Sequence, residues 1–153
     1  MYQIDPAYLR FFKPVKEGKV IRGKWSDSTL KEAVIKLYQA KLNQADQRNT
    51  VERSEWWWDR LDAYYLGRSV CVYFDKNNQS QGYMFYRIVE RNFQVEEMYY
   101  QTPQAAQALL SIIASHSSRD LKYYVKMPEE SLLGEFFPEQ ERLYCKYAAL
   151  YDD

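Results

Sequence analysis

The stretch VCVYFDKNNQSQGYMFYRIVERNFQVEEMYY, residues 70–100, decides the fold. Its three runs at 70–74, 82–90 and 93–100 are rich in Val, Ile, Tyr and Phe, which strands favour. Residues 75–81 form a link rich in Asn and Asp, and Arg91-Asn92 is short enough for a hairpin turn. Because such short links join antiparallel neighbours, the stretch predicts a three-stranded antiparallel meander.

Two helices are predicted ahead of the meander. Residues 26–29 (Ser-Asp-Ser-Thr) are helix-capping types, and Thr29 with Glu32 has the spacing of a capping box. Apolar residues then recur at helical spacing, which predicts a helix over 28–43. A second helix, over 52–65, carries Trp56, Trp57 and Trp58. Three adjacent side chains span about 200° of a helix, so these indoles cannot all face one core.

After the meander, Thr102-Pro103 predicts the start of a third helix, because Thr is a good N-cap and Pro suits the first helical position. This helix is expected to end near residue 116. A strand over 121–127 follows and can lie parallel to strand 93–100. A short helix over 129–137 and a last strand over 141–151 are also predicted. We therefore expect an α+β fold whose mixed, mostly antiparallel sheet is flanked by helices.

Composition excludes several classes of protein. The 153 residues are 46% hydrophobic and 27% charged, with 21 basic and 21 acidic side chains, which argues against a disordered chain and against a nucleic-acid partner. No apolar run reaches the roughly 20 residues of a membrane span, and the N-terminus does not resemble a signal peptide, so a cytoplasmic location without membrane partners is expected. One histidine and two distant cysteines predict no metal site, and Cys71 is expected to be a buried free thiol.

The order of elements resembles the acyl-CoA-dependent N-acetyltransferase fold called GNAT. The local sequence resembles the second, central domain of the enhanced-intracellular-survival family of multi-domain N-acetyltransferases. The resemblance covers roughly residues 15–153 and is diffuse. It is carried by the runs at 82–88, 93–100 and 108–118, by Arg53 ahead of the tryptophans, by Leu132-Leu133 before Phe137-Pro138, and by residues 147–152 (YAALYD).

This resemblance implies acetyl-CoA as the cofactor of the parent family and a primary amine, aminoglycoside-like or protein lysine, as the acceptor. It also implies a division of the chain. Residues 1–25 would be a lead-in from a preceding acetyltransferase domain, and residues 26–140 the GNAT-like domain. Residues 141–153 would be a closing strand or a link to a following sterol-carrier-like domain. The expected partners are the neighbouring domains of the same enzyme, or further copies of this chain.

A GNAT domain holds the pyrophosphate of coenzyme A on backbone N–H groups, within Gln/Arg-x-x-Gly-x-Gly/Ala at the start of a helix. Residues 101–106 (QTPQAA) occupy that place. Gln101 and Ala106 match, but Gln104 replaces the first glycine, and Pro103 removes one N–H donor. We therefore expect a helix cap without its own acetyl-CoA site, and an isolated chain that is inactive; an altered but working site is the alternative.

Four residues are weak candidates for catalysis. Strict alternation puts Glu96 and Glu97 on opposite faces of their strand, so that one of them can point into a cleft and act as a base toward an amine; a solvent-facing or paired carboxylate is the alternative. Tyr99 can be a general acid or a packing residue. His116 can be a general base or can interact with the end of the helix dipole. Arg53 can clamp an anion or form a structural ion pair.

Three functions follow from these observations. The first is a central, non-catalytic GNAT-like domain that holds its neighbours and helps to wall the substrate pocket. The second is a stand-alone module whose Tyr- and Trp-rich surface binds a partner protein or another copy of itself. The third is a small GNAT enzyme with an unusual pyrophosphate loop.

Overall fold

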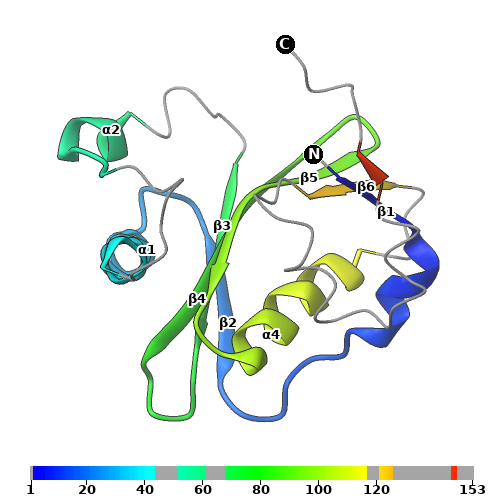
Figure 1. Ribbon diagram of the computed structural model, residues 1–153, viewed down its shortest axis with the longest axis horizontal. Helices are drawn as coiled ribbons and strands as arrows, with labels where there is room; N and C mark the ends of the chain where they lie inside the picture. The colour runs from blue at the N-terminus through cyan, green and yellow to red at the C-terminus, as the bar shows by residue number, and fades with distance from the viewer. Residues whose placement is uncertain (1, 44–51, 61–67, 117–120, 126–145, 148–153) are drawn as a thin grey trace.

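The residues that the structure describes form a seven-stranded mixed sheet in the order β2-β3-β4-β5-β6-β1-β7 (Figure 1). The computed structural model describes residues 2–43, 52–60, 68–116, 121–125 and 146–147. All neighbouring strands pair antiparallel except β5 and β6, which are parallel. The predicted α+β class, with its mostly antiparallel sheet and flanking helices, is confirmed.

The strands are β1 (Tyr2–Ile4), β2 (Lys19–Gly23), β3 (Ser69–Phe74), β4 (Ser80–Val89), β5 (Asn92–Tyr100), β6 (Lys122–Val125) and β7 (Lys146–Tyr147). The helices are the 3-10 helix η1 (Pro6–Phe11) and the α-helices α1 (Ser28–Leu42), α2 (Glu55–Asp59) and α4 (Pro103–Ala114). Among the described residues, no helix combines the length and the apolar character needed to cross a membrane.

The predicted meander is confirmed as β3, β4 and β5. Its second turn lies one residue earlier than predicted, because Glu90 takes a positive φ of 57° and Asn92 already belongs to β5. The predicted parallel neighbour of β5 is confirmed as β6. Of the predicted last strand, Lys146–Tyr147 is described and pairs with β1. The helix predicted over 129–137 lies outside the described residues.

Residues 1–25 contribute two strands to the same sheet. β2 pairs with β3 and forms one edge, whereas β1 lies between β6 and β7. Between them, the Asp5 carboxylate accepts the Ala7 N–H at 2.9 Å and caps η1. The N-terminal residues are therefore part of the sheet, and their origin in a preceding domain stays a prediction.

Helix α1 begins at the predicted residue and ends one residue before the predicted end. Its N-cap is Asp27, whose Oδ1 accepts the N–H groups of Thr29 at 3.0 Å and Leu30 at 3.3 Å. The predicted capping box of Thr29 and Glu32 is wrong, because the short carboxylate of Asp27 already satisfies the first-turn donors.

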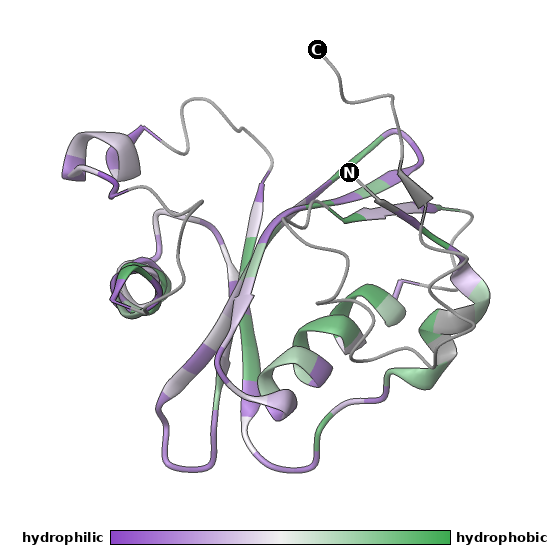
Figure 2. Ribbon diagram, viewed as in Figure 1, coloured by the Kyte–Doolittle hydropathy of each residue, from purple (hydrophilic) through white to green (hydrophobic). Residues whose placement is uncertain are grey.

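Helices cover both faces of the sheet (Figures 1 and 2). We call the face under α1 and α2 the α1 side, and the face under α4 and η1 the α4 side. Alternation along β3 and β4 sends side chains to both. The α1 side buries Trp25, Leu30, Val34, Leu37, Tyr38, Trp58, Val70, Val72, Phe74, Tyr83 and Phe85. The α4 side buries Leu9, Phe12, Cys71, Met84, Tyr86, Phe93, Val95, Leu109, Leu110 and Ile113.

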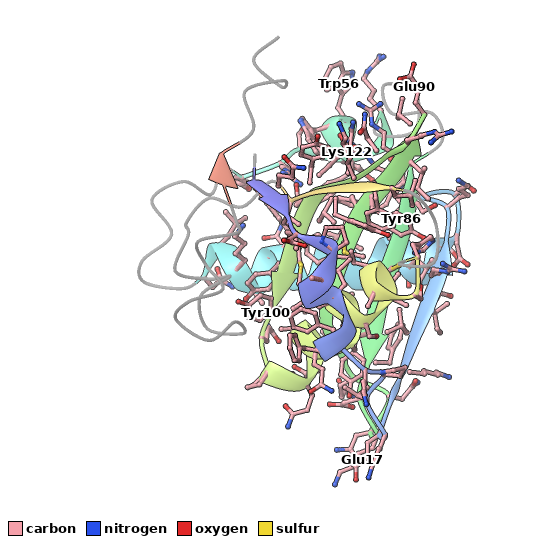
Figure 3. All side chains as sticks on the ribbon, turned by 90° about the vertical axis from the view of Figure 1, so that its right-hand side faces the viewer. Glu17, Trp56, Tyr86, Glu90, Tyr100 and Lys122 are labelled. Atoms are coloured by element: carbon pink, nitrogen blue, oxygen red, sulfur yellow. The ribbon has the colours of Figure 1, made fainter. Side chains whose placement is uncertain are left out.

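The three adjacent tryptophans do not share one core, as predicted. Trp58 is 2% exposed and stacks on Trp25, with ring centroids 5.4 Å apart. Trp56 is 60% exposed, projects from the surface (Figure 3) and lies under the guanidinium of Arg60, 4.3 Å from its ring centroid. Of the predicted helix over 52–65, the structure describes α2 and the residues beside it.

Cys71 is fully buried and free, as predicted. Burial raises the pKa of its thiol from 9.0 to about 12. The unfolded thiol therefore ionises first, and the free energy of unfolding should fall by about 1.4 kcal/mol per pH unit between pH 9 and about pH 12 because of this group. Burial also raises the pKa of Tyr83, which acts in the same direction above its ordinary value of 10.0.

We predict that, in a Cys145→Ser background, Cys71 does not react with a disulfide reagent at pH 8 until urea unfolds the protein. Urea titrations from pH 8 to 11 should show a smaller loss of stability for Cys71→Ala than for the parent. Rapid modification of the native protein would contradict this account of the core.

Candidate functional site

Strand β5 contains a β-bulge at Glu96. Phe85 of β4 lies opposite Glu97, whereas Tyr86 lies opposite Val95, so Glu96 is an extra residue with no partner position on β4. The bulge stops the alternation of faces at this point. The prediction that Glu96 and Glu97 lie on opposite faces is therefore wrong, and both carboxylates lie on the α1 side, where each contacts an arginine.

Glu97 is a paired carboxylate. Arg53 donates to it in a bidentate arrangement, from NH1 to Oε2 at 3.0 Å and from NH2 to Oε1 at 2.7 Å. The hydroxyl of Tyr83, from β4, donates to Oε2 as well. The side chains of Arg53 and Glu97 are only 18% and 21% exposed, and charge-assisted pairs of this geometry are strong. Both oxygens of Glu97 are therefore engaged, and its role as a base stays a prediction.

Arg53 also packs against aromatic rings. Its guanidinium carbon lies 4.2 Å from the ring centroid of Tyr38 on α1 and 4.0 Å from that of Trp57 on α2. Burial by itself lowers the pKa of Arg53, but the hydrogen bonds and charge of Glu97 outweigh burial and raise it. Of the two roles predicted for Arg53, the geometry is that of a structural ion pair.

Glu96 forms a second ion pair on the same side. Arg68, which directly precedes β3 and is 7% exposed, donates from Nε to Oε1 at 3.2 Å and from NH2 to Oε2 at 2.9 Å. Arg87 approaches Oε1 at 3.4 Å and donates to the side-chain oxygen of Gln94 at 3.2 Å. Two adjacent carboxylates are thus neutralised by two arginines, of which Arg53 precedes α2 in the sequence and Arg68 follows it.

Lys41 and Tyr99 lie next to the Glu97 pair. The ammonium nitrogen of Lys41 is 5.9 Å from the ring centroid of Tyr38 and 5.7 Å from that of Tyr99. Burial lowers the pKa of Lys41; the charge of Glu97 partly offsets this, and the charge of Arg53 adds to it. We call Lys41, Arg53, Tyr83, Glu97 and Tyr99 the Glu97 cluster. Lys41 and Tyr83 were not predicted from the sequence; the spacing of Lys41 three residues after buried Tyr38 is the signal that could have indicated it.

His116 lies away from this cluster, on the α4 side. Its Nδ1 is 2.9 Å from the carbonyl oxygen of Ile112, and its ring contacts Phe93 at a centroid distance of 4.9 Å. Its own carbonyl oxygen accepts the hydroxyl of Tyr123 at 2.8 Å. Figure 3 shows that Tyr86, another neighbour of the His116 ring, lies on the same face. The structure therefore does not bring His116 together with Glu97, and the position matches the predicted contact with the helix end.

The start of α4 uses most of its own N–H donors. The hydroxyl of Thr102 accepts the Ala105 N–H at 3.1 Å, and the carbonyl oxygen of Thr102 accepts the Ala106 N–H at 3.2 Å. Pro103 has no N–H to offer. Among the hydrogen bonds of the described residues, the first turn thus leaves only the N–H of Gln104 without a partner.

Gln101 links this turn to the sheet. Its N–H donates to the carbonyl oxygen of Gln81 at 2.8 Å, and its side-chain amide lies 3.5 Å from the hydroxyl of Tyr99. Nearby, α4 packs so closely on β4 that a Cβ at Gly82 would lie 3.0 Å from the Cβ of Ala105. In the part of the chain that the structure describes, no three His, Cys, Asp or Glu side chains gather as a metal site would require.

Residues 50–148 match the family model for the acetyltransferase (GNAT) domain. The chain belongs to this GNAT family. A solved structure that this GNAT domain resembles is a probable N-acyltransferase of unknown function from Enterococcus faecalis V583, with 26% identity and a TM-score of 0.68. The match covers 86% of the GNAT domain and 34% of that protein.

Two further solved structures share the fold. A GCN5-related N-acetyltransferase from Kribbella flavida has 17% identity and a TM-score of 0.56, and the match covers 95% of the GNAT domain and 32% of that protein. A functionally unknown protein from Staphylococcus epidermidis ATCC 12228 has 9% identity and a TM-score of 0.60. This match covers 88% of the GNAT domain and 54% of that protein. The GNAT domain thus spans about a third to a half of these relatives, and no curated protein sequence matches it.

We predict that the Arg53–Glu97 pair is energetically coupled. Glu97→Gln should lower the free energy of unfolding by about 2 kcal/mol, because it leaves a mostly buried guanidinium without its charged partner. A double-mutant cycle with Arg53→Met should give a coupling of at least about 1 kcal/mol in urea titrations.

The exposed pair of Lys31 and Asp59, 2.8 Å apart, provides the matched control. The cycle of Lys31→Met and Asp59→Asn should give less than about 0.5 kcal/mol. Equal coupling energies in the two cycles would contradict the importance given to the Glu97 cluster.

Proposed function

We propose that this chain is the central, non-catalytic GNAT-like domain of a larger N-acetyltransferase of the enhanced-intracellular-survival type. The complete enzyme would transfer acetyl from acetyl-CoA to a primary amine, aminoglycoside-like or protein lysine. Support comes from the residues that carry the resemblance and from the Enterococcus faecalis probable N-acyltransferase, of which this chain spans 34%.

The observation that carries this proposal is the hydrogen bonding at the start of α4. A pyrophosphate at a helix N-terminus needs several free N–H groups and close approach of the backbone. Here Pro103 has no donor, Thr102 takes the N–H groups of Ala105 and Ala106, and the exposed Gln104 stands where the family motif has glycine. Because these residues do not fit a diphosphate, we propose that the chain has no acetyl-CoA site of its own.

The Glu97 cluster supports an architectural role. A general base must offer a lone pair to the proton that it removes, and three of the roughly four lone-pair positions of the Glu97 carboxylate already accept hydrogen bonds from Arg53 and Tyr83. The same cluster ties α1 and α2 to β5, because the Arg53 guanidinium also contacts the rings of Tyr38 and Trp57. A rigid face of this kind suits a domain that positions its neighbours in the whole enzyme.

A second candidate function is an aromatic-rich module for protein interaction or self-association. It is favoured by Trp56, which is 60% exposed although α2 also carries a fully packed tryptophan. Static light scattering distinguishes the two: a monomer across a wide concentration range argues against self-association, and a dimer weakened by Trp56→Ala supports it.

We predict that isothermal titration of the chain with acetyl-CoA gives no binding tighter than about 1 mM. The double variant Pro103→Ala, Gln104→Gly restores one donor and removes the glutamine side chain, so any gain of binding should appear in this variant. Micromolar binding by the parent chain, with a stoichiometry near one, would contradict the absence of a cofactor site.

The place of this domain in a larger enzyme has its own test. The genomic DNA on both sides of the coding stretch should continue in frame, with an acetyltransferase domain before it and a sterol-carrier-like domain after it. Stop codons that close the frame directly on both sides would contradict the multi-domain proposal.

A further inference from the structure

We propose that Lys41 is an acylation site, at which the side-chain amine takes an acetyl group directly from a thioester, with no bound cofactor. This inference does not depend on the proposed function, because it concerns the chemical reactivity of one side chain in its surroundings. It rests on the position of Lys41 among aromatic rings and charges at the end of α1.

The amine of Lys41 lies in a partly enclosed aromatic position. Its nitrogen is 5.9 Å from the ring centroid of Tyr38, one turn earlier on α1, and 5.7 Å from that of Tyr99 on β5. The residue is only partly exposed, so its nitrogen loses part of its hydration while a small reagent can still approach. Aromatic faces attract the ammonium ion only modestly and do not replace a carboxylate partner.

Within the described part of the chain, Lys41 has no ion-pair partner. Both oxygens of the nearby carboxylate, Glu97, already accept from Arg53 or Tyr83. Among the described residues, no carboxylate lies within 4.0 Å of the Lys41 nitrogen. On the same helix, Lys31 pairs with Asp59 at 2.8 Å and Lys36 is exposed to water, so α1 carries three lysines in three different environments.

Burial of Lys41 favours loss of its proton, whereas the charges around it act in opposite directions. Among the described residues, the groups near it are Tyr38 from α1, Arg53 ahead of α2, and Glu97 and Tyr99 from β5. Arg53 and Lys41 together carry two positive charges against the one negative charge of Glu97. Burial lowers the pKa of Lys41, Glu97 partly offsets this and Arg53 adds to it. Near neutral pH, a larger fraction of the Lys41 amine is then unprotonated and nucleophilic than for an exposed lysine.

The reaction is a simple acyl transfer. The unprotonated nitrogen attacks the thioester carbonyl carbon, the carbon–nitrogen bond forms and the carbon–sulfur bond breaks. The thiolate leaves and takes up the proton that the nitrogen loses, so the products are an acetamide and a free thiol. Acetylation removes a positive charge from a partly dehydrated site, and the Arg53–Glu97 pair keeps its hydrogen bonds.

The test compares three lysines of one helix in the folded chain. The protein is incubated at pH 7.5 with acetyl-CoA and, separately, with the small thioester S-acetyl-N-acetylcysteamine, and peptide mass spectrometry follows Lys31, Lys36 and Lys41. We expect Lys41 to react about threefold faster than Lys36, or more, with both reagents. A rate for Lys41 equal to or below that of Lys36 would overturn the proposal, as would reaction with acetyl-CoA alone.

Two variants should move the rate in opposite directions. Glu97→Gln removes the charge that favours the ammonium form and should speed acetylation of Lys41 about twofold or more, whereas Arg53→Gln frees Glu97 to pair with Lys41 and should slow it by a similar factor. Shifts of the opposite sign would overturn the proposal.

If either variant loses its native circular dichroism spectrum, the proposal is tested instead by the pH dependence of the acetylation rates in the parent protein. The Lys41 rate should reach its plateau at a lower pH than the Lys36 rate, and coincident profiles would overturn the proposal.

Discussion

One extra residue in β5, Glu96, determines how the α1 side of the sheet is built. If β5 alternated regularly, Glu96 and Glu97 would lie on opposite faces, and one carboxylate would enter the core under α4. The bulge places both on the α1 side, where two adjacent negative charges would repel each other if left alone. Arg53 and Arg68 neutralise one carboxylate each, so two segments of the chain are drawn onto the same strand.

The two sides of the sheet consequently differ in character. On the α1 side, ion pairs are packed against aromatic rings, as with Arg53 against Tyr38 and Trp57. On the α4 side, the core of the described residues is almost entirely apolar. The single histidine of the sequence, His116, contacts a carbonyl oxygen in the last turn of α4. At the start of α4, the N-cap residue Thr102 accepts the N–H groups of Ala105 and Ala106. Candidate residues for catalysis and for cofactor binding thus make structural contacts, which supports the architectural role that we propose.

Much of the fold was predictable from local patterns. Helix α1, the meander and the start of α4 each combine a clear period with residues that end or begin an element, such as Thr102-Pro103. Strand β1 was not predicted, because its three residues are too few to show alternation and are ordered by strands distant in sequence. The cap of α1 was misplaced because several residues before it can all accept first-turn N–H groups.

The site was predictable only in part. Glu97, Tyr99 and Arg53 were singled out, but their mutual contacts depend on the bulge, which strict alternation cannot predict. A signal was nevertheless present: Val95 and Met98, both apolar, fall on the same face only if one residue between them is extra. The contribution of Tyr83 depends on tertiary packing between β4 and β5, for which a single sequence holds no pattern. For Lys41, the only sequence signal is its spacing of three residues after Tyr38.

Deletion of Glu96, combined with Arg68→Met so that no buried arginine loses its partner, is the most direct test of the bulge. The account predicts that this variant keeps a cooperative urea transition and the near-ultraviolet circular dichroism of packed aromatic rings, since Val95, Glu97 and Met98 then alternate regularly. Deletion of Gln94, two residues earlier, reverses the faces of the strand and should abolish folding. An unfolded Glu96 deletion variant beside a folded Gln94 deletion variant would contradict the account.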